Sequence, residues 1–281
     1  MKSPIPLLLA TYFVSSISSA TVINIDFHDR AAALPVFSGQ AGANDSAGGV
    51  SAYWNPLGIS PSKTANAANL YDSTNIQTNV GFQLNGLHES VLDTNGDQES
   101  GGGYLDLMGD YVRVGSDSSG EVATANGKFT GLVVGGTYDL YFYGQGQYLS
   151  ELGPPTATNL RGQNTLFTVD GVSQQTSWDG FEGGDGFLVE GIEFVKFTTV
   201  ATDGGAEGGV ISFAFSNVVE TGDDANVTND LVPNGNTTGN TGSRFGALNG
   251  VQLVCVVPEP SAALLAMVAS IGLISRRRRQ A

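Results

Sequence analysis

Short runs of alternating apolar and polar residues recur along this chain, and they predict strands. The clearest run is Thr137–Gly144, where an apolar face alternates with a second face made of Asp139, Tyr141 and Tyr143. The same two-residue period predicts ten further strands: Val22–Phe27, Val80–Leu84, Tyr104–Leu107, Tyr111–Val114, Lys128–Val134, Thr165–Val169, Val172–Thr176, Ile192–Val200, Val210–Ser216 and Val251–Val257. We find no long segment with helical periodicity and no internal repeat.

Dipeptides that favour tight turns separate these runs. Asp170-Gly171 indicates a two-residue hairpin, and Asn85-Gly86, Asn126-Gly127 and Gly135-Gly136 indicate further turns. The polar, irregular stretch His88–Gly103 predicts a long exposed loop. Short strands at regular spacing predict an all-β fold, an antiparallel β-sandwich of the jelly-roll kind, over residues 21–257.

The two ends of the chain have a different pattern. Met1–Ala20 has a basic residue, an apolar run and a small-residue end, which is typical of a cleaved signal peptide and of export by the Sec machinery. Ser261–Ser275 contains no charge and is followed by four arginines, Arg276, Arg277, Arg278 and Arg279. This order predicts a single C-terminal transmembrane helix whose arginines stay in the cytoplasm. A buried C-terminal helix with a solvated basic tail is the alternative.

Pro258, Glu259 and Pro260 stand directly before the apolar run, and prolines keep such a segment extended. The order of Pro-Glu-Pro, apolar segment and arginine cluster resembles the PEP-CTERM sorting signal over residues 258–281. That segment is also called the ice-binding protein C-terminal domain, a label that is not evidence of ice binding. The resemblance implies recognition by an exosortase, transient anchoring in the inner membrane, and delivery to the cell surface or biofilm matrix.

The body carries a weaker resemblance. The opening Ile23–Phe27, the middle strand Thr137–Gly144 and the closing Leu248–Leu253 look like the galactose-binding-like jelly rolls of secreted carbohydrate-binding modules. This resemblance implies a sandwich with a sugar-binding surface.

Charge and cysteine content narrow the function classes. Of the twelve Lys and Arg, five lie at Lys2 and Arg276–Arg279, so seven remain against 27 Asp and Glu, a formal charge of about −20. Such a body repels nucleic acid, which we exclude as a partner. Cys255 is the single cysteine, so no intramolecular disulfide forms, and we expect it to pack as a small hydrophobe.

Two stretches could bind a ligand. Asp93, Asn95, Asp97 and Glu99 place oxygen side chains at every second position, like the first half of a calcium loop, but Gln98 stands where such loops have glycine. The hypothesis of a Ca²⁺ site therefore stands beside that of a solvated acidic turn. No other cofactor is expected.

Aromatic rings beside polar groups suit stacking and hydrogen bonding to a sugar. Asp139, Tyr141, Tyr143 and Trp178 are our candidates for glycan contact, with Trp54 in a second loop. The alternative is that these rings cover a sheet or fill the core.

Catalysis finds little support. The two histidines, His28 and His88, lack a nucleophile-elbow motif or a zinc signature, and no carboxylate pair can be selected among 27 acidic residues. We expect a non-catalytic, exported surface or matrix protein with a structural or adhesive role that binds an extracellular polysaccharide. A secreted hydrolase acting on polysaccharide and a purely structural surface protein without a ligand are the alternatives.

Overall fold

The structure is a computed structural model, and it describes the body of the chain in segments. The described residues are 21–27, 36–38, 41, 52–92, 104–115, 122–146, 163–177, 186–218 and 245–256. Residues 21–256 form one compact unit. The predicted signal peptide and the predicted sorting segment 258–281 lie outside the described residues. In the described part, no helix is long and apolar enough to cross a membrane.

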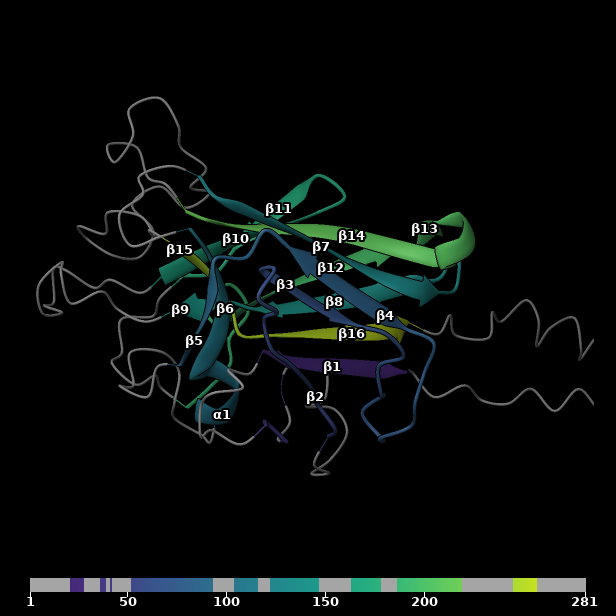
Figure 1. Ribbon diagram of the computed structural model, residues 1–281, viewed down its shortest axis with the longest axis horizontal. Coiled ribbons are helices and arrows are strands. Elements are labelled where there is room, and N and C mark those ends of the chain that lie inside the picture. The colour runs from purple at the N-terminus through teal and green to yellow at the C-terminus, as the bar shows by residue number, and fades with distance from the viewer. Residues whose placement is uncertain are drawn as a thin grey trace, which may run out of the picture. The chain divides into compact units, whose positions relative to one another are not determined.

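Three sheets make up this unit (Figure 1). The first sheet has the order β12-β8-β16-β1-β2. Its strands are β1 (Val22–Phe27), β2 (Asn55–Leu57), β8 (Thr137–Tyr143), β12 (Phe194–Val200) and β16 (Gly250–Val256). Its ladders are antiparallel except that of β1 with β2.

The second sheet has the order β11-β10-β14-β7-β4-β3, and the short strands β9 and β13 pair with β10 and β14. Its strands are β3 (Thr64–Ala67), β4 (Gly81–Asn85), β7 (Thr124–Leu132), β9 (Gln145–Gly146), β10 (Gln163–Val169), β11 (Val172–Gln175), β13 (Thr202–Asp203) and β14 (Gly209–Asn217). The third sheet joins β5 (Glu89–Leu92), β6 (Asp110–Gly115) and β15 (Phe245–Leu248). The helical elements described are α1 (Leu105–Met108) and the short 3-10 helix Gly205–Glu207. The predicted all-β class with antiparallel sheets is confirmed.

The core lies between the first two sheets. Every second side chain of the long strands points into it, so apolar residues of both sheets belong to one buried cluster. Aromatic rings connect the layers: the ring centroids of Phe142 in β8 and Phe213 in β14 are 4.9 Å apart, and those of Phe27 and Phe82 are 5.9 Å apart. This packing is what a sandwich uses in place of the disulfide that the sequence cannot form.

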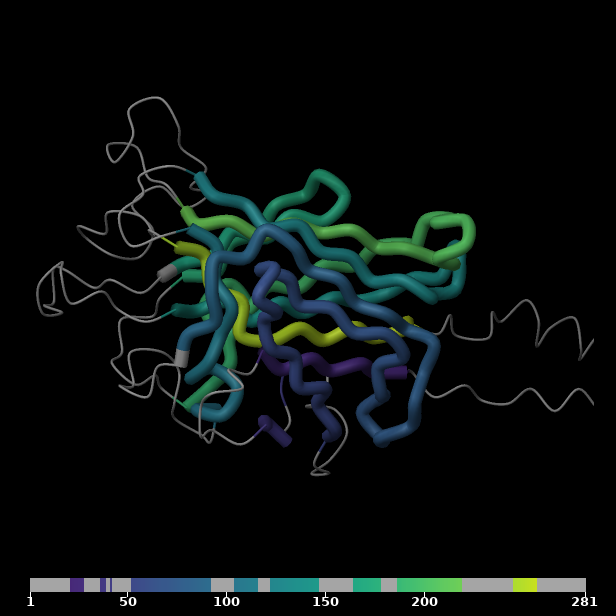
Figure 2. The backbone as a smooth tube through the Cα atoms, viewed as in Figure 1, coloured from purple at the N-terminus to yellow at the C-terminus, as the bar shows by residue number. Residues whose placement is uncertain are grey.

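The first and last strands of the body are neighbours. β1 pairs with β16, Val22 lying opposite Val254, and the Cys255 amide donates to the Thr21 carbonyl at 2.9 Å. The start of β1 and the end of β16 therefore lie at one end of the sandwich (Figure 2). Cys255 packs against the core, in line with its predicted role as a small hydrophobe.

Three predictions about local structure were wrong. Tyr104–Leu107 does not form a strand: the Met108 amide donates to the Tyr104 carbonyl at 2.8 Å, and α1 follows. Asn126-Gly127 lies inside β7 and forms no turn, because both residues pair with β14; a Cβ at Gly127 would stand 2.2 Å from the Phe213 ring. Glu89–Leu92 is a strand within the predicted loop, because it gains a partner in β6.

Candidate functional site

The outer face of the first sheet, which points away from the core, divides into two halves. Over one half, a second apolar cluster covers the ends of β8 and β12. Trp54 belongs to this cluster, its ring 6.3 Å from Tyr143 and 5.1 Å from Phe37. α1 adds Leu107 and Met108 to the cover. This half is closed to an extended ligand.

Beneath the cover, a chain of hydrogen bonds crosses three strands. The Tyr143 hydroxyl donates to Gln252 Oε1 at 2.5 Å, and Gln252 Nε2 donates to Asn24 Oδ1 at 2.8 Å. Asn24 Nδ2 then donates to the Tyr53 carbonyl at 2.9 Å. These three side chains are fully buried. The chain of bonds pairs polar groups whose burial would otherwise be costly, and it fixes the order β8-β16-β1.

The other half of this outer face carries polar groups around one aromatic ring. Lys196 Nζ lies 2.8 Å from Asp139 Oδ2 and 5.2 Å from the centroid of the Tyr141 ring. Thr198 Oγ1 donates to Asp139 Oδ1 at 2.6 Å. The hydrogen bond to Asp139 is the main reason why the pKa of Lys196 is raised, so the ammonium stays charged near neutral pH. The group thus brings together an aromatic ring, a cation over that ring and a carboxylate.

A second aromatic pair lies beside the β1 edge of the same sheet. The rings of Tyr53 and Tyr71 are 5.6 Å apart, and Tyr71 is 36 % exposed. Asn55 holds the backbone of this segment by donating to the Tyr71 carbonyl and accepting from the Tyr71 amide. β8 and β1 are separated by β16, so Tyr141 and the β1 edge are about 10 Å apart. Gln252 and Asn24 lie in register between them and are fully buried, so the two aromatic groups do not share one open surface.

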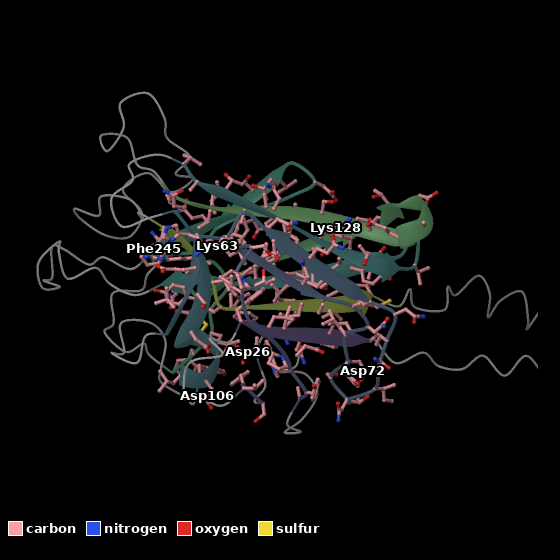
Figure 3. All side chains as sticks on the ribbon, in the orientation of Figure 1. Asp26, Lys63, Asp72, Asp106, Lys128 and Phe245 are labelled. Carbon is pink, nitrogen blue, oxygen red and sulfur yellow. The ribbon has the colours of Figure 1, made fainter. Side chains whose placement is uncertain are left out.

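A fully buried carboxyl, that of Asp26, lies on the closed half (Figure 3). Its Oδ2 accepts the Phe37 amide at 2.9 Å, while its Oδ1 has no hydrogen-bond partner among the residues that the structure describes. Burial, and then the charge of Asp110, raise the pKa of Asp26 well above the ordinary value near 3.8. Within the described segments, no group of three or more His, Cys, Asp or Glu could hold a metal ion.

The predicted site residues fall into two groups. Asp139 lies on the open half, and Tyr141 lies at its border, where its ring packs against the second cluster with its centroid 5.9 Å from that of Phe194. Tyr143 and Trp54 have almost no exposed surface, since the second cluster covers them. Trp178, the calcium candidates Asp93, Asn95, Asp97 and Glu99, and the sorting residues of 258–281 lie outside the described residues.

Lys196 and Thr198 were missed by sequence reasoning. Both stand on the polar face of the predicted strand Ile192–Val200, but nothing in the sequence says that this strand pairs with β8. The tyrosine pair at the β1 edge was missed for the same reason, because its two members are brought together by a long connection.

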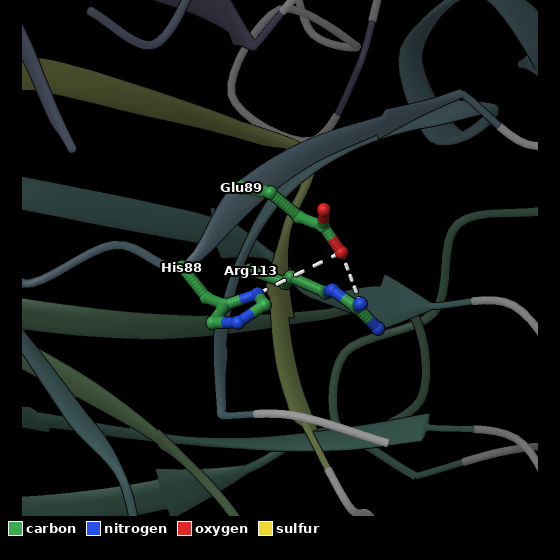
Figure 4. Close-up of polar contacts among 3 residues, drawn as sticks. All are labelled: His88, Glu89 and Arg113. Carbon is green, nitrogen blue, oxygen red and sulfur yellow. Dashed lines mark hydrogen bonds and ion pairs between the residues drawn. The ribbon is translucent and has the colours of Figure 1, made fainter. Parts of the chain in front are cut away.

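One further polar cluster involves His88, whose Nδ1 lies 3.7 Å from Glu89 Oε1 (Figure 4). Glu89 also binds Arg113, and the Arg113 guanidinium lies 4.9 Å from the centroid of the Phe245 ring. These contacts tie β5, β6 and β15 together. We interpret the contact between Glu89 and Arg113 as a structural ion pair whose guanidinium packs on the Phe245 ring.

No protein family and no curated protein matches the chain. Among solved structures, the chain is similar to TmCBM61 in complex with β-1,4-galactotriose, with 10 % identity and a TM-score of 0.27. That match covers 62 % of this chain and 88 % of the other.

Proposed function

We propose that this protein is a non-catalytic carbohydrate-binding protein whose ligand lies on the open half of the first sheet's outer face. The observation that carries the proposal is the Tyr141 ring, which is partly exposed and flanked by the Asp139–Lys196 ion pair. A sugar presents C–H groups that pack on a ring and hydroxyls that bond to charged neighbours. The three side chains offer both kinds of contact within one small area.

The charge of the protein indicates which glycans fit. The body carries a formal charge of about −20, so a polyanionic polysaccharide would be repelled over most of the surface. Lys196 is the cation of the site, and Asp139 already neutralises it. We therefore expect a neutral glycan as the ligand.

Glycan-array and affinity-gel binding by the purified full-length protein test the proposal. Tyr141→Ala removes the partly exposed ring, and we expect it to weaken binding by at least about tenfold, the equivalent of 1.4 kcal/mol. Tyr143→Phe is the matched control on the same strand face, because its ring is buried. Equal binding by the Tyr141 variant and the wild type would remove this site.

The absence of catalysis is part of the proposal and has its own test. Glycans that bind are incubated with the protein, and we expect no new reducing ends. Release of reducing ends that depends on an acidic side chain would favour the hydrolase alternative.

The ends of the chain support a destination for this binding module. We infer that Met1–Ala20 directs export and that Pro258-Glu259-Pro260, the apolar segment and Arg276–Arg279 direct sorting by an exosortase-type protease. The protein would be anchored in the inner membrane until it is processed. Its role at the surface or in the matrix would then be adhesive, through the bound polysaccharide.

A further inference from the structure

Three exposed valines gather at one end of the sandwich. Val133 and Val134 form the connection between β7 and β8 and are 69 % and 53 % exposed, and Val200, the last residue of β12, is 50 % exposed. Val200 lies opposite Thr137, the first residue of β8. Aliphatic side chains grouped at a turn, where polar residues are usual, indicate a surface that meets something apolar.

This apex, the three valines Val133, Val134 and Val200, is held firmly. The Gly135 amide donates to the Ala201 carbonyl at 2.8 Å, and the Ala201 amide donates to the Gly136 carbonyl at 2.9 Å. The Val133 amide donates to the Tyr138 hydroxyl at 3.0 Å. The valines are therefore presented by a fixed backbone and pay little ordering entropy when they bind.

The body also ends beside this apex. Val256, the last residue of β16, lies opposite Thr137. The chain continues from there for 25 residues, of which Ser261–Ser275 carry no charge and Arg276–Arg279 are basic. The apolar run begins five residues after β16 ends. If it enters a membrane, only this short linker separates the membrane from the apex.

We propose that the apex is a lipid-facing contact that rests on the bilayer surface while the C-terminal segment anchors the protein. The inference depends on the anchoring proposed above. The apolar side chains enter the boundary between headgroups and acyl chains, as the apolar faces of peripheral anchors do. A folded-back tail is the alternative occupant, but a run of 15 uncharged residues ending in four arginines is suited to lipid rather than to three valines.

The charges near the apex favour zwitterionic lipid. Asp203 lies in β13, which pairs with β14 opposite the end of β7, and Glu207 forms an ion pair with Lys128 at 2.7 Å. Anionic headgroups would meet Asp203 and the strongly negative body. The probe membrane is therefore a phosphatidylcholine vesicle.

A fluorescence experiment on the full-length protein tests the contact. Cys255 is first replaced by serine, and an environment-sensitive dye is attached at Val134→Cys or, as a control, at His88→Cys. His88 precedes β5, at the opposite end of the sandwich from the β7–β8 connection (Figure 1). On reconstitution, the dye at position 134 should shift its emission to shorter wavelength and be quenched by lipid-bound nitroxide. The dye at position 88 should stay accessible to aqueous iodide.

Vesicle flotation distinguishes failure of the lipid contact from failure of the anchoring proposal. If the protein floats with the vesicles but the dye at position 134 stays accessible to iodide, the lipid contact is refuted and the anchor stands. If the protein does not float, the anchoring proposal fails and the contact fails with it. Thermal melting of the two labelled variants confirms that both retain the fold.

Discussion

At the residue scale, Asp26 is unusual because its carboxyl is fully buried and its pKa is well above the ordinary value. Its carboxyl is buried, with one oxygen bonded to the Phe37 amide and the other without a partner in the described part of the chain. Burial and Asp110 raise its pKa, so the folded protein holds a proton that the unfolded chain releases near pH 3.8. The resulting stability is full below that pH and is lost as pH rises through the raised pKa.

We expect Asp26→Asn to raise the free energy of unfolding at pH 7 by about 1–3 kcal/mol, because an amide keeps the Phe37 bond and removes a buried charge. Urea unfolding at a series of pH values measures this, and the gain should shrink towards pH 4. Glu190→Gln, at an exposed position, is the control and should change little. A variant less stable than the wild type at pH 7 would show that the folded protein stabilises the charged Asp26 carboxylate enough to offset the cost of burying it.

Tyr143 shows why position on a strand face does not reveal depth. Its alternation with Phe142 was predicted correctly, yet the half of the face on which it lies is covered by residues from α1 and from positions 37–54. Those contacts join residues from 35 positions apart (Met108 and Tyr143) to 106 positions apart (Phe37 and Tyr143). No local pattern reports them, so sequence reasoning placed Tyr141 and Tyr143 in the same environment.

We expect Tyr143→Phe to lower the free energy of unfolding by about 1 kcal/mol, because it removes the buried hydrogen bond to Gln252. Chemical denaturation measures the loss. Thr198→Val, which removes an exposed hydrogen bond to Asp139, should cost less. Equal losses would mean that the buried chain of hydrogen bonds adds no stability of its own.

At the scale of elements, turn chemistry was predictable where the turn alone decides the backbone. Asp170 and Gly171 have φ of 50° and 77°, the positive values that a two-residue hairpin needs, and β10 and β11 pair as predicted. Asn126-Gly127 has the same kind of sequence but lies in a strand. There the glycine leaves room for the ring of Phe213, which lies opposite it on the neighbouring strand β14. Glycine is therefore needed for packing between strands and not for a turn.

Gly246 in β15 lies very close to the backbone of Ser216 in β14. A Cβ there would stand 2.6 Å from the backbone carbonyl carbon and oxygen of Ser216. We expect Gly246→Ala to destabilise the protein by about 3 kcal/mol, because backbone of β14 must move. Gly171→Ala has open space but a positive φ, and should cost about 1 kcal/mol. Thermal melting compares them, and an equal or smaller effect at position 246 would show that β15 shifts freely.

At the scale of the whole molecule, the all-β class followed from the sequence, while the number of strands and their sheet membership did not: eleven strands were predicted, and the described residues form sixteen. The third sheet brings Phe245–Leu248 against β6, over 130 residues away in sequence, and neither turn signals nor alternation predicts that partner. The proposed binding face likewise combines β8 with β12, two strands about 50 residues apart in sequence. Its individual residues were visible in the sequence, but the surface that they form was not.

The proposed destination is tested in the cell. Replacing Pro258, Glu259 and Pro260 with alanines should leave the protein in the inner membrane, because the extended segment that a sorting protease would read is lost. Membrane fractionation measures this. Substitution of Asp223 and Asp224, acidic residues elsewhere in the chain, should leave sorting unchanged. Normal release of the Pro-Glu-Pro variant would overturn the sorting proposal.

The pairing of β1 with β16 has a mechanical consequence. A pull on the C-terminal end draws β16 along its own axis, and the ladders to β8 and β1 on its two sides then carry the load in shear, many hydrogen bonds at once. A pull between Thr21 and Val256 instead peels β1 from β16 one bond at a time, because the two ends meet at the same edge of the ladder. A protein tethered by its tail and loaded through a ligand on the sheet would thus bear force in its stronger direction.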